Sequence, residues 1–142
     1  MPSRTFPAVA ASVPEARGYV TALLAPLAPD VCEVAALLVS ELATNAIRHA
    51  GGRTFEVTVR PLTDPDRVWC GVSDTGSSQP VLRSPAVTDE HGRGLRLIGV
   101  LSDRWGAHRR RATDTKTVWF ELNYDPRAPA PADRTPEAER TA

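Results

Sequence analysis

Apolar and polar residues follow two different periods along the chain, and the helical period dominates its first third. Before that region, residues 3–7 suit a short edge strand that a proline ends. Apolar residues at helical spacing predict a helix over about 14–27, with Ser12 as a candidate cap. A second, longer helix is expected from a cap at Asp30 to about Ala50, where two glycines end it.

The rest of the chain favours an antiparallel sheet with one further helix. Two hairpins are expected, and their strands are residues 54–60 with 67–73 and residues 105–109 with 117–122. A loop rich in Gly, Ser, Pro and Asp occupies 75–91, and its length is typical of a functional lid. A short helix is expected after it, at about 95–101.

Strands and helices do not alternate one by one in this order, which favours an α+β fold over a doubly wound parallel sheet. We expect a single domain over residues 1–124. Residues 125–142 are rich in Pro, Ala and charge and contain no large apolar side chain, so they are predicted to be a disordered tail.

Composition gives no support for a nucleic-acid-binding protein, a membrane protein or a cysteine metal site. The 142 residues carry 17 basic and 17 acidic side chains, so net charge gives no argument for contact with nucleic acid or an anionic membrane. No membrane-length apolar run or signal pattern occurs, which predicts a cytoplasmic protein. Cys32 and Cys70 lack metal-site spacing, and we expect two reduced, mostly buried thiols.

A polar row lies within the apolar stripe of the second helix. Glu41, Asn45 and His49 are spaced by four, so they stack on one face. Asn45 and His49 fall inside the apolar arc, and Glu41 lies on its flank. Burying an amide without a partner costs on the order of 1–3 kcal/mol, so this row needs partners. A ligand is one candidate, and backbone groups with a solvated Glu41 are the other.

Two glycine-containing segments add candidate binding residues. Asp74 ends an apolar strand just before Gly76, and it either caps a turn or offers a carboxylate to a ligand amine. Gly92, Gly94 and Leu95 open the third helix. Glycines there let backbone N–H groups approach a phosphate, and a helix N-terminus favours the negative charge.

Taken in this order, and with Thr117 on the last strand, these segments resemble the GHKL superfamily of ATPases and kinases, which share the Bergerat fold. The resemblance covers about residues 3–124. It is nearest to the anti-sigma-factor serine kinases, whose helix motif typically reads Glu-x-x-x-Asn-Ala-x-x-His, as residues 41–49 do. It implies a two-layer sandwich in which about three helices pack on one side of a mixed, mostly antiparallel sheet.

The resemblance also implies roles for the residues. Glu41 would be the general base, Asn45 would ligate Mg²⁺, and Asp74 would accept a hydrogen bond from the amine of adenine. Thr117 would help form the adenine pocket through a water. The implied ATP-binding set is Asn45, His49, Asp74, Gly76, Gly92, Gly94, Leu95 and Thr117.

The implied activity is a protein serine/threonine kinase that binds a sigma factor and phosphorylates an anti-anti-sigma protein. A homodimer is implied too, without direct contact with nucleic acid or membrane. Ser78 and Lys116 stand where the family usually has glycine. Two alternatives stay open: a non-catalytic binding module on the same fold, and the detached catalytic domain of a histidine kinase.

Two further groups of residues are given structural interpretations. Trp69, Trp105 and Trp119 lie in strand-like segments and are expected in the core. The basic run at 109–111 is expected at a hairpin turn, as either a solvated turn or a partner-docking surface.

Overall fold

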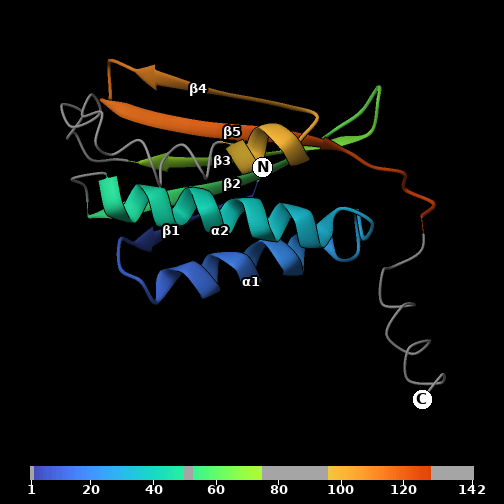
Figure 1. The fold of residues 1–142 in the computed structure, drawn as a ribbon, viewed down its shortest axis with the longest axis horizontal. Coiled ribbons are helices and arrows are strands. Elements are labelled where there is room, and N and C mark those ends of the chain that lie inside the picture. The colour runs from blue at the N-terminus through green and yellow to red at the C-terminus, as the bar shows by residue number, and fades with distance from the viewer. Residues whose placement is uncertain (1, 50–52, 75–95, 129–142) are drawn as a thin grey trace.

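The computed structural model describes residues 2–49, 53–74 and 96–128. Its elements are β1 (Ser3–Pro7), α1 (Ser12–Leu24), α2 (Cys32–His49), β2 (Thr54–Leu62), β3 (Arg67–Asp74), helical residues 96–101, β4 (Arg104–Arg110) and β5 (Thr115–Asn123). Figure 1 shows the helices lying against a single sheet. No helix within the described ranges is long and apolar enough to cross a membrane.

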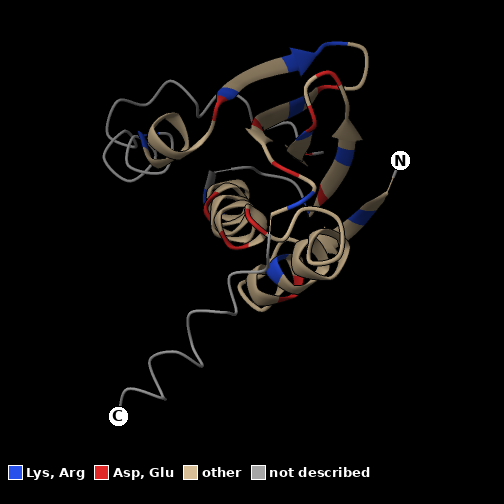
Figure 2. Cartoon of the chain, turned by 90° about the vertical axis from the view of Figure 1, so that its right-hand side faces the viewer, with Lys and Arg blue, Asp and Glu red and all other residues tan. Residues whose placement is uncertain are grey.

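The five strands form one antiparallel sheet in the order β1-β2-β3-β5-β4. Figure 2 shows α1 and α2 nearly end-on, both on the same side of the curved sheet. The predicted α+β fold with a helix layer on one side is therefore confirmed. All neighbouring strand pairs among the described residues are antiparallel, so the expected mixed component does not occur there.

The first helix begins and ends differently from its predicted bounds. Ser12 is its first residue, and its hydroxyl donates to the carbonyl of Pro7 at 2.6 Å instead of capping the helix. The helix ends at Leu24, whose carbonyl accepts the N–H groups of Leu27 and Ala28 in the following turn. The predicted cap was therefore wrong, because a tertiary acceptor in β1 competes for the hydroxyl.

The second helix starts at Cys32, two residues after the predicted cap at Asp30. The Asp30 carboxylate accepts a hydrogen bond from the backbone N–H of Asp125 at 3.2 Å, so it joins this turn to the end of β5. The cap prediction is corrected accordingly. The predicted end at Ala50 lies outside the described residues, and α2 is described as far as His49.

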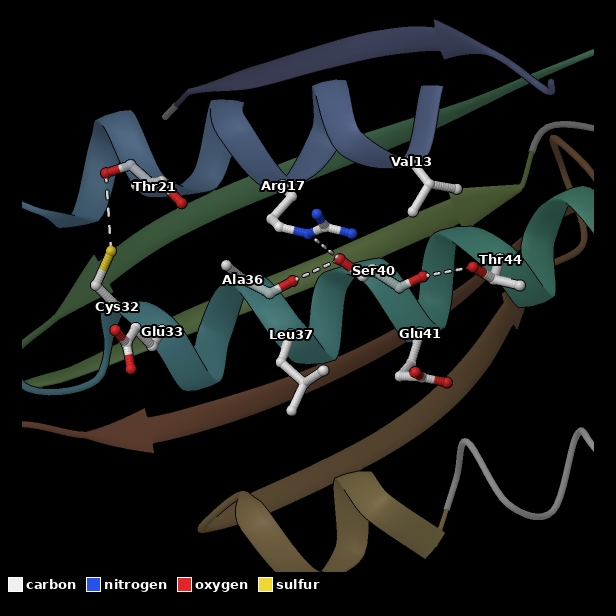
Figure 3. A pocket seen from close by; sticks show the side chains of 10 residues that line it. All are labelled: Val13, Arg17, Thr21, Cys32, Glu33, Ala36, Leu37, Ser40, Glu41 and Thr44. Carbon is white, nitrogen blue, oxygen red and sulfur yellow. Dashed lines mark hydrogen bonds between the residues drawn. The ribbon is translucent and has the colours of Figure 1, made fainter. Parts of the chain in front are cut away.

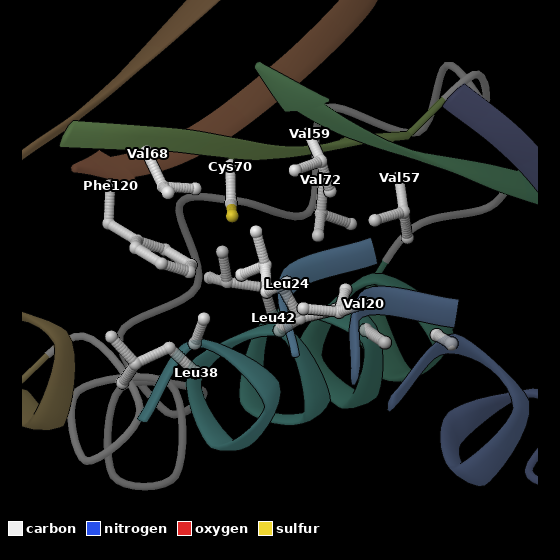
Figure 4. Close-up of a cluster of buried hydrophobic side chains, with 14 of the residues drawn as sticks. Val20, Leu24, Leu38, Leu42, Val57, Val59, Val68, Cys70, Val72 and Phe120 are labelled. Atoms are coloured by element: carbon white, nitrogen blue, oxygen red, sulfur yellow. The ribbon is translucent and has the colours of Figure 1, made fainter. Parts of the chain in front are cut away.

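The core lies between α1, α2 and the inner face of the sheet. Successive strand residues point to opposite faces, and on β3 the residues Val68, Cys70 and Val72 point toward the helices (Figure 4). Phe120 of β5 pairs with Cys70 and is fully buried with them. The even-numbered positions of β3 and β5 therefore form the helix-facing surface.

The tryptophans do not occupy this core, contrary to the prediction. Trp69 and Trp119 are at odd positions and stack on the outer face, with ring centroids 6.1 Å apart. Gly71 leaves the space that the Trp69 ring occupies, because a Cβ there would stand 2.5 Å from a ring carbon. Trp105 is 43% exposed on β4. The size of the side chain suggested burial, whereas strand parity places Trp69 and Trp119 on the outer face. Trp105 shares the helix-facing side with Phe120 but lies on the edge strand.

Both cysteines are free and buried, as the sequence indicated. Burial raises the pKa of the Cys70 thiol well above its usual range, and it also raises that of Cys32. Because the thiolate is the reactive form, we expect Cys70 in the native protein to resist a thiol reagent at pH 8 and to react promptly in urea. In the Cys32→Ser variant, Cys70 is the one remaining thiol, so the reaction reports on Cys70 alone. Fast reaction of this variant in the native state would contradict the expectation.

Candidate functional site

The polar end of α2 and the polar end of β3 lie at the same end of the sandwich. Figure 1 shows α2 and β3 running in the same direction, with β5 starting at the end where they finish. Asp74 is the last residue of β3, and Asn45 is about one turn before the end of α2. The structure therefore brings together, at one end, two of the predicted nucleotide-binding residues.

Glu41 and Asn45 lie on the margin of the buried stripe of α2. Both side chains are half-buried, whereas Leu38 and Leu42 on the same helix are buried. Figure 3 shows Glu41 pointing away from α1, toward the side of helical residues 96–101. Asn45 is one turn further along the same side of the helix. The sequence predicted Asn45 inside the apolar arc of this helix, whereas the structure has it at the edge of the buried stripe, because α2 also packs against α1.

The Asn45 amide has no hydrogen-bond partner among the described residues. A half-buried amide without a protein partner is available to bind a ligand. Such binding is favourable because a polar group left unpaired costs free energy when water is excluded. His49 is the last described residue of α2, but its side chain lies outside the described part of the chain.

Asp74 lies beside a lysine on the helix-facing surface. Strand pairing places Asp74 between Phe55 of β2 and Lys116 of β5. Lys116 is half-buried, and burial lowers the pKa of its ammonium, as does Arg109, whereas the Asp74 carboxylate acts in the opposite direction. A carboxylate and an ammonium therefore stand together at this end of the sheet.

Thr117 lies on the opposite face of the sheet. It pairs with Ser73, and their hydroxyl oxygens are 2.8 Å apart. The structure does not bring Thr117 to the surface that Asp74 shares with Lys116. The resemblance assigned the threonine to the adenine pocket, whereas counting back in twos from the buried Phe120 places Lys116 on the face that Asp74 occupies.

The remaining predicted site residues cannot be placed. Gly76, Gly92, Gly94 and Leu95 all lie outside the described residues, as does Ser78. The described part of the candidate site is thus Glu41 and Asn45 on α2 and Asp74 on β3, with Lys116 added by the sheet register.

A separate groove of about 440 Å³ runs between α1 and α2. In it, the Arg17 guanidinium donates to the hydroxyl of Ser40 at 3.0 Å, and Ser40 donates to the carbonyl of Ala36 (Figure 3). Glu41 lines one edge of this groove, but Asn45 and Asp74 do not. Among the described residues, the groove meets the predicted nucleotide site only at Glu41.

The residues present fit a magnesium–nucleotide complex better than an all-protein metal cage. Within residues 2–49, 53–74 and 96–128, no three His, Cys, Asp or Glu side chains group as metal ligands. Magnesium prefers oxygen ligands, keeps several waters and is commonly held by one or two side chains together with substrate phosphates. The Asn45 carbonyl oxygen is a ligand of that kind.

Comparison with known proteins matches this geometry to a family. The family model described as the histidine kinase-like ATPase domain matches residues 6–122, from β1 to the end of β5. The chain belongs to this family. A relative from Streptomyces coelicolor, the uncharacterized protein SCO4941, is 38% identical over 102 residues, which are 70% of this chain and 92% of the relative. Membership of this ATPase family implies ATP binding, and the matched range includes every described candidate residue.

Proposed function

We propose that this chain is a protein serine/threonine kinase of the anti-sigma-factor type. It would bind a sigma factor and transfer the γ-phosphoryl group of ATP to a serine of an anti-anti-sigma protein. The observation that carries the proposal is the pair on α2: a carboxylate, Glu41, one turn before an amide, Asn45, that has no hydrogen-bond partner in the described part of the chain. Phosphoryl transfer requires chiefly positioning and charge neutralisation, together with a carboxylate near the attacking hydroxyl.

Each described residue has one task in this proposal. The Asp74 carboxylate accepts a hydrogen bond from the amine of adenine at the end of β3. The Asn45 oxygen holds Mg²⁺, which when bound neutralises charge on the triphosphate. Glu41 accepts the proton of the serine hydroxyl as that oxygen bonds to the γ-phosphorus of ATP, while the bond from this phosphorus to the bridging oxygen breaks and ADP leaves. The half-exposed position of Glu41 on the side of residues 96–101 leaves it within reach of another protein.

The surface around Glu41 suits a protein substrate. Leu37 points to the same side of α2, one turn before Glu41, and is 42% exposed (Figure 3). Exposed apolar side chains also occur on the neighbouring helical residues, at Val100 and Leu101. Such side chains would give a partner protein apolar contacts beside the proposed base. The sigma factor, the anti-anti-sigma protein and a homodimer are partners by resemblance.

A second candidate is a non-catalytic ATP-binding regulator on the same fold. Lys116 is the observation behind it, because this lysine stands where the kinases of the resembled type usually have glycine. The two candidates differ in one property: only a kinase needs the Glu41 carboxylate.

Asn45→Ala is expected to weaken Mg²⁺-dependent ATP binding about tenfold or more, because it removes the only metal ligand proposed from the protein. Isothermal titration calorimetry with ATP, with and without Mg²⁺, measures this. Asn123→Ala is the matched control, since Asn123 is exposed at the far end of β5. Wild-type protein that binds no ATP at millimolar concentration would overturn the proposed function. Unchanged binding by Asn45→Ala would remove the magnesium role.

A further inference from the structure

Lys116 occupies the position opposite Asp74 in the register of β3 and β5. Directly opposed residues of an antiparallel pair have Cβ atoms about 4.5–5.5 Å apart and point to the same face. Because the even-numbered positions of β3 and β5 face the helices, both side chains project toward the helix layer. They lie at the end of the sheet where α2 finishes, as the course of the ribbons in Figure 1 shows. Their juxtaposition follows from the backbone pairing and does not depend on a rotamer.

The two groups have complementary hydrogen-bonding capacities. An ionised carboxylate only accepts, through about four lone-pair positions, and an ammonium only donates, through three N–H groups. One edge of adenine carries the matching pair: the exocyclic amine donates, and the adjacent ring nitrogen N1 accepts. A neighbouring acceptor and donor on the protein can therefore read both positions of this edge.

We infer that Lys116 is a base-recognition residue, which donates from Nζ to N1 of adenine while the Asp74 carboxylate accepts from the neighbouring amine. This inference rests on the proposed ATP site and gives Lys116 a part in the adenine pocket, in which the resemblance implied Thr117. Thr117 faces the opposite side of the sheet, where its hydroxyl bonds Ser73.

The environment of Lys116 supports a directed contact. The side chain is half-buried, and a long amphipathic side chain in that position packs its stem and directs its ammonium along the surface. Arg109, its neighbour on β4, is bonded instead to Asp114, with Nη1 and Oδ1 3.2 Å apart. Of these two adjacent cations on the same face, Lys116 is the one paired with Asp74 across the sheet.

The test compares ATP with 1-deaza-ATP, which lacks the N1 acceptor but keeps the amine and the triphosphate. Wild-type protein should bind ATP about tenfold more tightly than 1-deaza-ATP, because a hydrogen bond to a charged group is lost. Lys116→Met keeps the aliphatic stem and should bind both nucleotides equally, at about the wild-type affinity for 1-deaza-ATP. Lys116→Arg should keep part of the discrimination.

Arg109→Met is the matched control, since it removes a positive charge from the same face one strand further from Asp74. It should keep the preference for ATP. Wild-type protein that binds ATP and 1-deaza-ATP equally overturns the inference alone, as does Lys116→Met that retains the wild-type preference. Equal weakening of both nucleotides by Lys116→Met also overturns it, because the lysine would then act on the triphosphate or the fold. Absence of ATP binding by the wild type overturns the proposed function itself.

Discussion

Glu41→Gln is expected to slow phosphoryl transfer to a protein serine by a factor of about 10²–10⁴, the usual contribution of a positioned general base. The amide keeps the shape of the side chain but cannot take up the proton of the attacking hydroxyl. Because Glu41 lies on the margin of α2 and is half-exposed, the substitution should disturb neither the core nor the nucleotide. Affinity for Mg²⁺-ATP should stay within about twofold, so the loss appears in the transfer step.

The measurement follows transfer from γ-labelled ATP to small proteins in fractionated extract of the source organism, with phosphoserine identified in the labelled band. Glu33→Gln is the matched control, because Glu33 is also on α2 and lines the same groove, two turns before Glu41. It should transfer phosphate like the wild type. If Glu41→Gln binds ATP and transfers phosphate at the wild-type rate, Glu41 is not the base. If the wild type binds ATP but transfers none, the non-catalytic regulator is the better description.

The strands were predictable because apolar and polar residues alternate within a few consecutive positions of the sequence. Alternation in 54–60 and 67–73 anticipated β2 and β3 to within two residues at each end. Both helices begin within two residues of their predicted starts, but their predicted caps were wrong for a different reason. Ser12 and Asp30 are good caps in isolation, but their oxygens bond to Pro7 and to Asp125, which the folded chain brings near. The preference of these side chains for capping a helix is overridden by hydrogen-bond partners that only the folded chain brings near.

The candidate site was predictable where the spacing of residues in the sequence determines which face of a helix they share or where a strand ends. Four-residue spacing on a helix placed Glu41 and Asn45 on the same side, and the end of an apolar strand located Asp74. The last strand shows the limit of this reasoning. A family motif supplied a threonine, whereas the alternation of buried residues toward Phe120 assigns the position beside Asp74 to Lys116. The same alternation would have placed Trp69 and Trp119 outside the core.

Phe120→Ala should cost about 3–5 kcal/mol of unfolding free energy, as large core truncations generally do. Phe120 is fully buried in the middle of β5, opposite Cys70 of β3 and Trp105 of β4, and it points toward the helix layer (Figure 4). Its removal would leave a cavity where β5, the strand that carries Lys116, meets the helices. Since small domains are stable by only about 5–15 kcal/mol, such a loss would leave the native state marginal.

Urea denaturation followed by far-ultraviolet circular dichroism measures this cost, with the slope m checked for a change in cooperativity. Trp105→Ala is the control, because it removes an aromatic ring from the adjacent strand and the same face, but one that is 43% exposed. It should lose clearly less stability than Phe120→Ala. Equal losses would mean that the ring on β4 contributes as much to the core as the one on β5. In that case the buried part of the helix-facing surface extends to the edge strand.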